Sequence, residues 1–484
     1  MAGRGRRKIA IIGAAIAGPT FALQILSHPV LRARFHPILF DQSPPPRSLA
    51  SVFPKYVASG PLARQGHRSG ASVGIFANGL YPLYKLGLKD ALRQKGIELA
   101  DLSIWYCGLD GTREKLQRQM NPTWSEKLGT GTMFYEWGDL REILLQRIVE
   151  LGGEVEWGRE LVGVEALGDG TVAVQFRDGQ KELADLVVGA DGGFSKVRRS
   201  MLEHKDPNTA QSVWTPDFQG TTGIYGISSA KDARWGDDVH PEDQHLIFVD
   251  NGYLATGPSP GGKVRWDLVL RESDPPAHLA EDAATEARLA AAAASTDDAL
   301  ERRWLSAMRP NQYSPSSTLE ILHRFKDVFH PAMGSLESIF NNAERIIRGP
   351  LRQRVWTEDE IQHGNVVLIG DASRLLLPTS GQGTGFAIED ATVLADFLLR
   401  HTGPELDGSF CKALKEYARE RVPRSRKMAL VASVARQWSM GSAWYWRAMR
   451  YYGVKWGPGG GDLRKKSMGD RWPSDARFKV GDGM

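Results

Sequence analysis

The chain has 484 residues, of which 42% are hydrophobic and 24% charged, and its formal net charge is +4. This length suits two or three domains, and the composition is that of a globular protein. The charge is small for the length, and many basic residues lie near the two ends, which argues against a nucleic-acid-binding protein. Two cysteines, Cys107 and Cys411, are too few for a disulfide framework and favour a reducing, cytoplasmic location.

The N-terminal segment has two interpretations. Basic residues at 4–8 precede an apolar run at 9–26, as in a secretory signal. The alternative is a buried strand at 8–12, a glycine turn and a helix. A second strand at 37–40, ending at Asp41, would lose its partner if the first part were cleaved, so the alternative is favoured. No run of about 18 apolar residues occurs elsewhere, and we expect no integral membrane segment.

The periodicity of apolar residues predicts the remaining elements. Strands are predicted at residues 161–166, 172–176, 186–188, 222–227, 246–249, 264–270 and 366–369. Helices are predicted at residues 82–95, 139–151, 283–294, 318–328 and 383–400, followed by a mostly helical stretch, bent at Pro423, at 410–449. The alternating strands between about 213 and 345 indicate an inserted domain with its own sheet.

The first of three glycine-rich turns is G-A-A-I-A-G at residues 13–18. Gly13 would permit the tight turn, and Gly18 would permit close packing of helix on strand. A helix start there offers amide groups and a positive dipole end to a pyrophosphate. Asp41, at the end of the next strand, suits a hydrogen bond to an adenosine ribose. The pattern favours dinucleotide binding over a plain strand-to-helix turn, although Ala15 stands where the middle glycine belongs.

The second turn is D-L-V-V-G-A-D-G-G-F-S-K-V-R-R at residues 185–199. A buried strand ends there, and a helix begins near Ser195. Gly192 and Gly193 beside Asp191 indicate backbone that lies close to another group. An ordinary strand-to-helix turn explains this segment equally well.

The third turn is G-D-A-S-R-L-L-L-P-T-S-G-Q-G-T-G-F-A-I-E-D-A at residues 370–391. Asp371 follows a buried strand, where ligands bind in open parallel sheets. Pro378 stiffens the loop, and three glycines, at 381, 383 and 385, open the next helix. A reduced flavin carries negative charge near one pyrimidine edge, which a helix N-terminus stabilises. A plain helix cap would not need three glycines and a proline.

With these three motifs in this order, the chain resembles the class A flavoprotein monooxygenases, the family of p-hydroxybenzoate and salicylate hydroxylases. The resemblance covers most of residues 8–425. Further matching segments are residues 70–73, 78–79, 86–88, 139–141 and 417–424. The stretch at 137–199 is particularly similar to the tetracycline-inactivating branch.

The resemblance implies a role for each matching residue. Gly13, Gly18 and Asp41 would hold the ADP half of FAD, Asp371 would bind the ribityl chain, and residues 381–383 would lie against the flavin pyrimidine. Asp191 and Gly192 would support the pyrophosphate region and transiently bound NAD(P)H. The implied cofactor-binding set is Gly13, Ala15, Gly18, Asp41, Arg141, Asp191, Gly192, Asp371, Pro378, Gly381, Gln382 and Gly383.

Three departures from the family pattern bear on the chemistry. Ala15 replaces a glycine near the pyrophosphate, and Trp137 stands where many relatives have an arginine near the flavin. Arg374 replaces the usual histidine after G-D-A; it would stabilise reduced, anionic flavin, hold an acidic substrate, or be a surface arginine. Tyr225 matches a position that often faces substrate, although core packing also explains it. Arg374 and Tyr225 are the candidate catalytic residues.

The resemblance implies an α/β fold with a discontinuous Rossmann-like FAD-binding domain, an inserted mixed-sheet substrate domain and a C-terminal helical region. We assign residues 1–80, 131–212 and 346–400 to the FAD-binding domain and 81–130 with 213–345 to the substrate domain. Residues 401–456 would be C-terminal helices, and 457–484 a flexible tail.

The implied function is FAD-dependent monooxygenation. NAD(P)H reduces the flavin and leaves, O2 adds to it, and a flavin hydroperoxide hydroxylates or epoxidises an aromatic or polycyclic small molecule. This explains why no catalytic triad, paired carboxylate or zinc-type cluster stands out, and we expect no metal. The alternatives are another flavin-dependent oxidase, reductase or halogenase, and a non-enzymatic FAD-binding protein.

Overall fold

A computed structural model describes residues 5–52, 72–207, 213–236, 238–274, 276, 283–403 and 410–462. Of the matching segments named above, residues 70 and 71 lie outside this part, as does most of the expected tail, at 463–484.

The first layer is a six-stranded sheet in the order β20-β21-β12-β1-β2-β8, parallel except for the edge strand β20. Its strands are β1 (Arg7–Ile12), β2 (Phe35–Asp41), β8 (Glu154–Trp157), β12 (Leu186–Gly189), β20 (Gln362–His363) and β21 (Val366–Leu368). Strands β1 and β21 are separated by more than 350 residues of sequence, yet both flank β12. The chain order reverses at β1, which is the point where open parallel sheets bind ligands.

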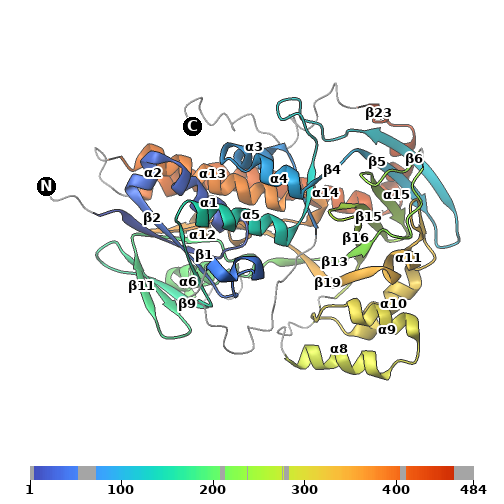
Figure 1. The fold of residues 1–484 in the computed structure, drawn as a ribbon, viewed down its shortest axis with the longest axis horizontal. Helices are drawn as coiled ribbons and strands as arrows, with labels where there is room; N and C mark the ends of the chain where they lie inside the picture. The colour runs from blue at the N-terminus through green and yellow to red at the C-terminus, as the bar shows by residue number, and fades with distance from the viewer. Residues whose placement is uncertain are drawn as a thin grey trace.

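Helices cover this sheet and share its core, which is the larger of the two main hydrophobic cores. Helix α1 (Ala17–Ser27) packs against α13 (Gly383–His401) and α5 (Trp137–Glu150), and Figure 1 shows α13 running behind α1 and α3 (Ala77–Lys85). The other elements around this sheet are α2 (Pro29–Arg34), α4 (Lys89–Lys95), α6 (Lys196–Lys205), α12 (Glu358–Ile361), η1 (Arg47–Val52), η3 (Gly370–Ala372) and η4 (Pro378–Ser380).

Two small sheets complete the first layer. One contains β9 (Leu161–Ala166), β10 (Val172–Phe176) and β11 (Lys181–Ala184), and the other β3 (Ser72–Ile75), β4 (Ile97–Glu98) and β7 (Met133–Glu136).

The second layer is a nine-stranded sheet in the order β22-β19-β13-β16-β15-β14-β5-β6-β23. Its strands are β5 (Asp101–Cys107), β6 (Arg113–Met120), β13 (Asp217–Ser229), β14 (Gln244–Val249), β15 (Gly252–Ser259), β16 (Lys263–Arg271), β19 (Ala343–Val355), β22 (Arg374–Leu375) and β23 (Gly461–Asp462). Because residues from the third glycine motif form β22, the two layers are physically joined at the expected flavin loop.

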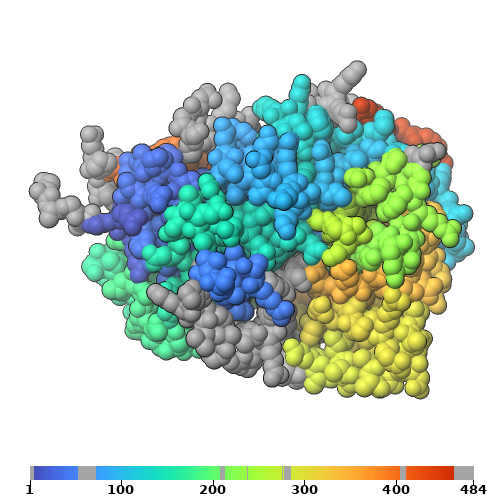
Figure 2. Space-filling view, in the orientation of Figure 1, coloured from blue at the N-terminus to red at the C-terminus, as the bar shows by residue number. Residues whose placement is uncertain are grey.

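One face of the nine-stranded sheet, the outer face, packs on a helical lobe. The lobe contains α8 (Ala283–Ser295), α9 (Ala299–Ala307), α10 (Pro315–Phe325) and α11 (Leu336–Asn341), next to the β17 (Phe329–His330) and β18 (Gly334–Ser335) hairpin. Figure 2 shows this lobe, in yellow, projecting at the lower right. The other face, the inner face, packs at one end on α14 (Cys411–Met440) through Ala432 and Met440.

Several boundaries differ from the sequence prediction for local reasons. The single helix expected at 82–95 is two helices, because the chain reverses at Gly87 with a φ of +78°. Helix α14 runs through Pro423, and the break falls at Gly441, where φ is +56°. Strands β5 and β6 were not predicted.

The aromatic C-terminal segment packs only partly on the core. Helix α15 (Trp444–Lys455) buries Arg450 and Val454, whereas Trp444 and the adjoining Trp456 are 74% and 71% exposed. Tyr445 and Tyr452 are exposed as well, so most of the aromatic rings of this segment do not pack on the core. Within the described part of the chain, none of the helices combines the length and apolar character that a membrane span requires.

Candidate active site

The first glycine turn brings β1 against β12. Gly13 has a φ of +109°, and a Cβ on it would lie 2.3 Å from the carbonyl oxygen of Ala190. A Cβ on Gly18 would lie 2.0 Å from the carbonyl oxygen of Gly13. Both positions therefore need glycine, for the tight turn and the close helix packing that the sequence predicts.

Asp41 ends β2 and orders this turn. Its Oδ2 accepts a hydrogen bond from the Ala14 amide at 2.7 Å, and its Oδ1 accepts one from the Ser43 amide at 2.8 Å. Arg141 on α5 donates from Nε to the Ala14 carbonyl at 2.6 Å. Burial lowers the pKa of Arg141, and the nearby charge of Asp41 opposes that effect. Asp41 and Arg141 thus fix the turn from two sides.

A cavity of about 550 Å³ lies beside this turn, a volume suited to a cofactor. It brings together residues from both of the first two motifs and from α5. Six of the expected cofactor-binding residues line it, namely Gly13, Ala15, Asp41, Arg141, Asp191 and Gly192. Trp137, which departs from the family pattern, lines the same cavity.

Asp191 in the second motif caps helix α6. Its Oδ2 accepts hydrogen bonds from the amides of Lys196 at 2.7 Å and Val197 at 3.1 Å. Its Oδ1 is buried without a hydrogen-bond partner, and burial raises the pKa of this carboxyl group. Gly192 has a φ of +87° and open space where a Cβ would be. An orphaned oxygen and open backbone at the cavity wall are what a bound polar ligand would satisfy.

The third motif meets the first at Gly370. A Cβ on Gly370, whose φ is +60°, would lie 2.9 Å from the Cβ of Ala17 at the start of α1. Asp371 and Pro378 are exposed. Gly381 has a φ of +63° and lies under the ring of Phe76, whereas Gly383 has open space at the start of α13. All three motifs therefore lie together in space.

Arg198 on α6 clamps the second motif to the third. It is fully buried, and it donates to the carbonyls of Ala372 and Gly193, each at 2.6 Å. Its guanidinium lies 3.5 Å from the ring centroid of Trp356. Burial lowers the pKa of Arg198 to about 9. Sequence reasoning missed this residue, because its partners are carbonyls that no side-chain pattern reveals.

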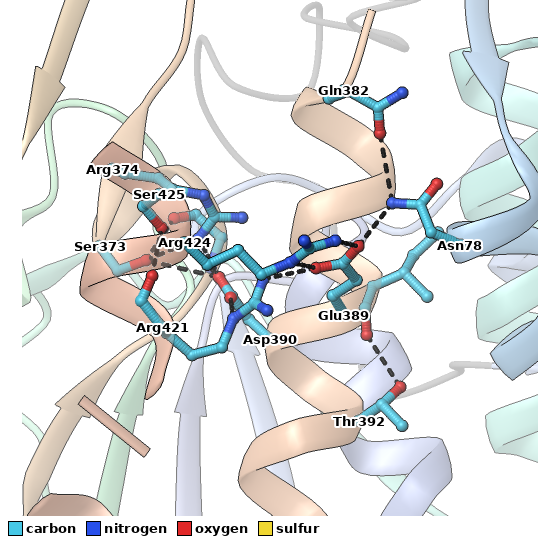
Figure 3. Close-up of polar contacts among 12 residues, drawn as sticks. Asn78, Ser373, Arg374, Gln382, Glu389, Asp390, Thr392, Arg421, Arg424 and Ser425 are labelled. Carbon is cyan, nitrogen blue, oxygen red and sulfur yellow. Dashed lines mark hydrogen bonds and ion pairs between the residues drawn. The ribbon is translucent and has the colours of Figure 1, made fainter. Parts of the chain in front are cut away.

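A buried network of charges holds the start of α13 (Figure 3). Glu389 and Asp390 are fully buried, and Arg421 of α14 contacts both, at 2.8 Å and 2.6 Å. Arg424 also pairs with Glu389, at 2.6 Å. Burial alone would raise the pKa of Glu389, but the two arginines outweigh it and lower that pKa. The resemblance at residues 417–424 does not reveal this network, because the acidic partners lie on another helix.

Asn78 joins this network to Gln382. Its Nδ2 donates to Glu389 at 2.6 Å and to the Oε1 of Gln382 at 3.2 Å. Gln382 is fully buried, so its side chain is directed into the network.

Arg374 belongs to the same network. It is 2% exposed, and it donates to Asp390 and to the hydroxyl of Ser373. The surface alternative for Arg374 is therefore wrong. Figure 3 shows Arg374 to the left of α13 and Gln382 at the start of the helix. Arg374 bonds to Ser373 and to Asp390, which also accepts from the Gly370 amide, so Arg374 holds the loop that carries Asp371.

Tyr225 lies on the inner face of the nine-stranded sheet. Its ring folds over Gly223, where a Cβ would lie 2.3 Å from the phenol oxygen. Burial, with the nearby charge of Asp267, raises the pKa of Tyr225. Tyr225 is half-buried, so it is neither a fully packed core residue nor a surface residue.

These features fit FAD. The first turn and Asp41 suit its ADP half, the orphaned Asp191 oxygen and open Gly192 suit the adjoining wall, and the glycine-opened start of α13 suits an anionic ring edge.

Comparisons with known proteins agree. Over 377 residues the chain is 26% identical to the FAD-dependent monooxygenase cle3 of Aspergillus versicolor, covering 76% of this chain and 68% of that one. It is 25% identical to a salicylate hydroxylase of Pseudomonas putida, covering 86% and 82%.

The fold is similar to that of Klebsiella pneumoniae HpxO, solved with FAD and uric acid, with a TM-score of 0.67, 18% identity and 97% of each chain covered. The tetracycline destructase Tet(55) matches with a TM-score of 0.56 and 17% identity over 96% of this chain and 97% of that one.

The expected α/β fold, FAD as cofactor and the class of FAD-dependent monooxygenases are confirmed by these matches. The family model for the FAD binding domain matches residues 77–214 and 283–432, more than half of the chain. The chain belongs to the FAD binding domain family.

Proposed function

We propose that this protein inserts one atom of dioxygen into an aromatic or polycyclic small molecule, with NAD(P)H as a transient reductant. The observation that carries the proposal is the meeting of the three glycine motifs, shown by the contact between Gly370 and Ala17. The second motif joins them through Arg198, which donates to the carbonyls of Ala372 and Gly193.

FAD, when bound and reduced, supplies two electrons that split dioxygen into one transferred oxygen atom and one water molecule. The protein's own residues position and shield this chemistry. We assign Gly13, Asp41 and Arg141 to the ADP half because they line the cavity, and Gly18 because it packs closely on Gly13. Asp191 and Gly192 would hold the pyrophosphate region, where the unsatisfied Oδ1 can accept a hydrogen bond from a bound nicotinamide nucleotide or water.

The start of α13 would stabilise negative charge on the ring edge. The helix begins at Gly383, and the open space there leaves its first backbone amides accessible. The amides of Gly381 and Gln382 already donate to the Pro378 carbonyl at 2.8 Å and to the Ser380 hydroxyl at 3.3 Å. Asp371 would bind the ribityl chain from the adjoining loop. Arg374 holds that loop through Asp390, so we propose it as a positioning residue, and Tyr225 as a substrate contact on the facing sheet.

A reducing, cytoplasmic location agrees with the cysteines. Neither Cys107 nor Cys411 forms a disulfide in the described part of the chain, and Cys107 is buried in the outer-face core. Burial raises the pKa of the Cys107 thiol to about 11, so it stays protonated and unreactive at neutral pH.

The test begins with the FAD content of the purified protein. NADH and NADPH oxidation is then measured with phenols, indoles and polyketides, and products formed under labelled dioxygen are weighed. One labelled oxygen atom in the product supports the proposal. Turnover without label in any product would indicate an oxidase or reductase, and bound FAD without substrate-stimulated NAD(P)H oxidation would indicate a non-enzymatic FAD-binding protein.

A further inference from the structure

The inner face of the nine-stranded sheet carries several small residues around one polar cluster. Residues that face each other across β19, β13, β16 and β15 in this region include Gly349 opposite Gly223 and Asp267 opposite Ala255. Gly257 lies opposite Arg265 on the same face. A Cβ on Gly349 would meet no atom within 4 Å. The ring of Tyr225 lies over Gly223 and the guanidinium of Arg265 lies over Gly257, so the open space on this face is at Gly349.

The polar cluster is Arg265, Asp267 and Tyr225. Arg265 is 8% exposed, and its Nη1 donates to Asp267. Its Nε is buried without a hydrogen-bond partner, and it lies 3.2 Å from where a Cβ of Gly257 would be. Asp267 keeps 23% of its side chain exposed, although hydrogen-bonded strands flank it on both sides. A buried donor without a partner, next to a partly open acceptor, is a site for a ligand with both kinds of group.

Two connections through neighbouring strands join this cluster to the cofactor site. The guanidinium of Arg265 lies 4.4 Å from the ring centroid of Phe134 on β7. Two residues later, Glu136 leads directly into Trp137, which lines the cavity beside Gly13. On the neighbouring strand β3, the chain continues to Phe76, whose ring lies next to Gly381, two residues before α13.

The cations on this part of the face are each paired with a carboxylate. Lys263 contacts Glu136 at 3.1 Å and Glu344 at 3.0 Å. Arg345 contacts Glu136 at 3.6 Å, and Arg265 contacts Asp267. This part of the face is therefore polar, but carboxylates compensate its positive charges. A substrate carboxylate would meet the acceptor Asp267 as well as Arg265, which is unfavourable for binding an anion.

We propose that Arg265 and Asp267 bind a neutral polar group of the substrate, such as a phenol, an enol or an amide, and thereby select uncharged aromatic molecules over arenecarboxylates. The Nε of Arg265 would donate to the substrate's oxygen, and Asp267 would accept its O–H or N–H. This inference rests on the proposed function and names the substrate class of that same site.

The experiment uses the full-length protein loaded with FAD and matched pairs of probes that differ in charge. The pairs are benzamide and benzoate, salicylamide and salicylate, 3-hydroxybenzamide and 3-hydroxybenzoate, and 1-naphthol and 1-naphthoate. Binding is measured as the perturbation of the FAD absorbance spectrum, so turnover is not required. The variant is Asp267→Asn, which leaves the charge of Arg265 uncompensated, and the control is Asp250→Asn at the exposed β14–β15 turn.

We expect the original protein to bind the neutral member of a pair at least about tenfold more tightly than the anion. Asp267→Asn should shift this ratio toward the anion by about tenfold or more, and Asp250→Asn should leave it unchanged. Tighter binding of the carboxylates, an unchanged ratio in Asp267→Asn, or FAD-loaded protein whose spectrum no probe perturbs would overturn the inference. Failure to take up FAD would instead overturn the proposed function.

Discussion

Gly13 has no room for a side chain, because the Ala190 carbonyl occupies the space and the backbone has a φ of +109°. Such a φ costs a residue with a side chain about 1–3 kcal/mol. We predict that Gly13→Val reduces the FAD bound per purified chain at least about tenfold, since the turn must move away from β12. FAD stoichiometry by absorbance measures this loss. Gly168→Ala, where a Cβ has open space, is the control and should keep its FAD; equal FAD content in both variants would contradict the assignment.

Asp390 is the buried carboxylate that joins Arg374, Arg421 and the amide of Gly370. Removing one charge from a buried network leaves its partners uncompensated, so Asp390→Asn should destabilise the fold by about 3 kcal/mol or more. Asp396→Asn is the matched control on the same helix, because its partner Arg400 is 60% exposed. That pair should contribute less than about 1 kcal/mol. Urea unfolding compares the two variants, and similar losses in both would show that the network contributes little.

At the scale of elements, two buried histidines link β14 to the β17–β18 hairpin. His330 Nδ1 accepts from the amide of Met333 at 3.0 Å, so its Nε2 carries the hydrogen and donates to the Thr256 hydroxyl at 2.8 Å. His245 packs edge-on against His330 at 5.4 Å. Burial lowers the pKa of both histidines, and the nearby cations Lys115 and Arg118 lower that of His245 further, to about 4.

These histidines predict a loss of stability in acid. The unfolded chain protonates them near their ordinary value of 6.5, whereas the folded protein keeps His245 neutral down to about pH 4. Their contribution is therefore present above pH 6.5 and is lost as the pH falls, by about 1.4 kcal/mol per pH unit for each histidine. Urea unfolding between pH 6.5 and pH 4 measures the slope. His245→Phe should reduce it by one histidine's share, while His36→Gln, at a partly exposed site on β2, should not; a slope unchanged in His245→Phe would contradict the account.

The sequence predicts an element well where its apolar residues follow a regular pattern. Strands β9 and β10 match the predicted residues 161–166 and 172–176 at both ends, because alternating apolar residues and a turn at Asp178-Gly179 define them. Strand β6 was missed, since R-E-K-L-Q-R-Q-M lacks such alternation and pairs near one edge of the sheet. Strand β5 was missed as well, and its partner β14 lies well over a hundred residues later in the chain. The buried network was also missed, since Glu389 and Asp390 acquire their partners from α14, about thirty residues along the chain.

At the scale of the whole molecule, the proposed chemistry requires the nine-stranded sheet to be held over the cofactor site. Glu136 makes this connection: it ends β7, next to Trp137 in the cavity wall, and contacts Lys263 on β16 and Arg345 on β19. Glu344 also contacts Lys263, but it is 49% exposed and lies on the sheet itself.

Glu136→Gln should therefore loosen the sheet without removing FAD. Loss of both ion pairs admits water to the reacting centre, so more reduced flavin is oxidised by dioxygen without product formation. We expect the fraction of NAD(P)H consumption that yields hydrogen peroxide to rise by about threefold or more. A loss of about 1–2 kcal/mol of orienting energy is enough for such a rise. The FAD content should stay unchanged. Peroxide and product are measured together against NAD(P)H consumed. Glu344→Gln should leave the ratio as it is, and a similar rise in both variants would mean that the surface charge around Lys263, and not the connection through Glu136, governs coupling.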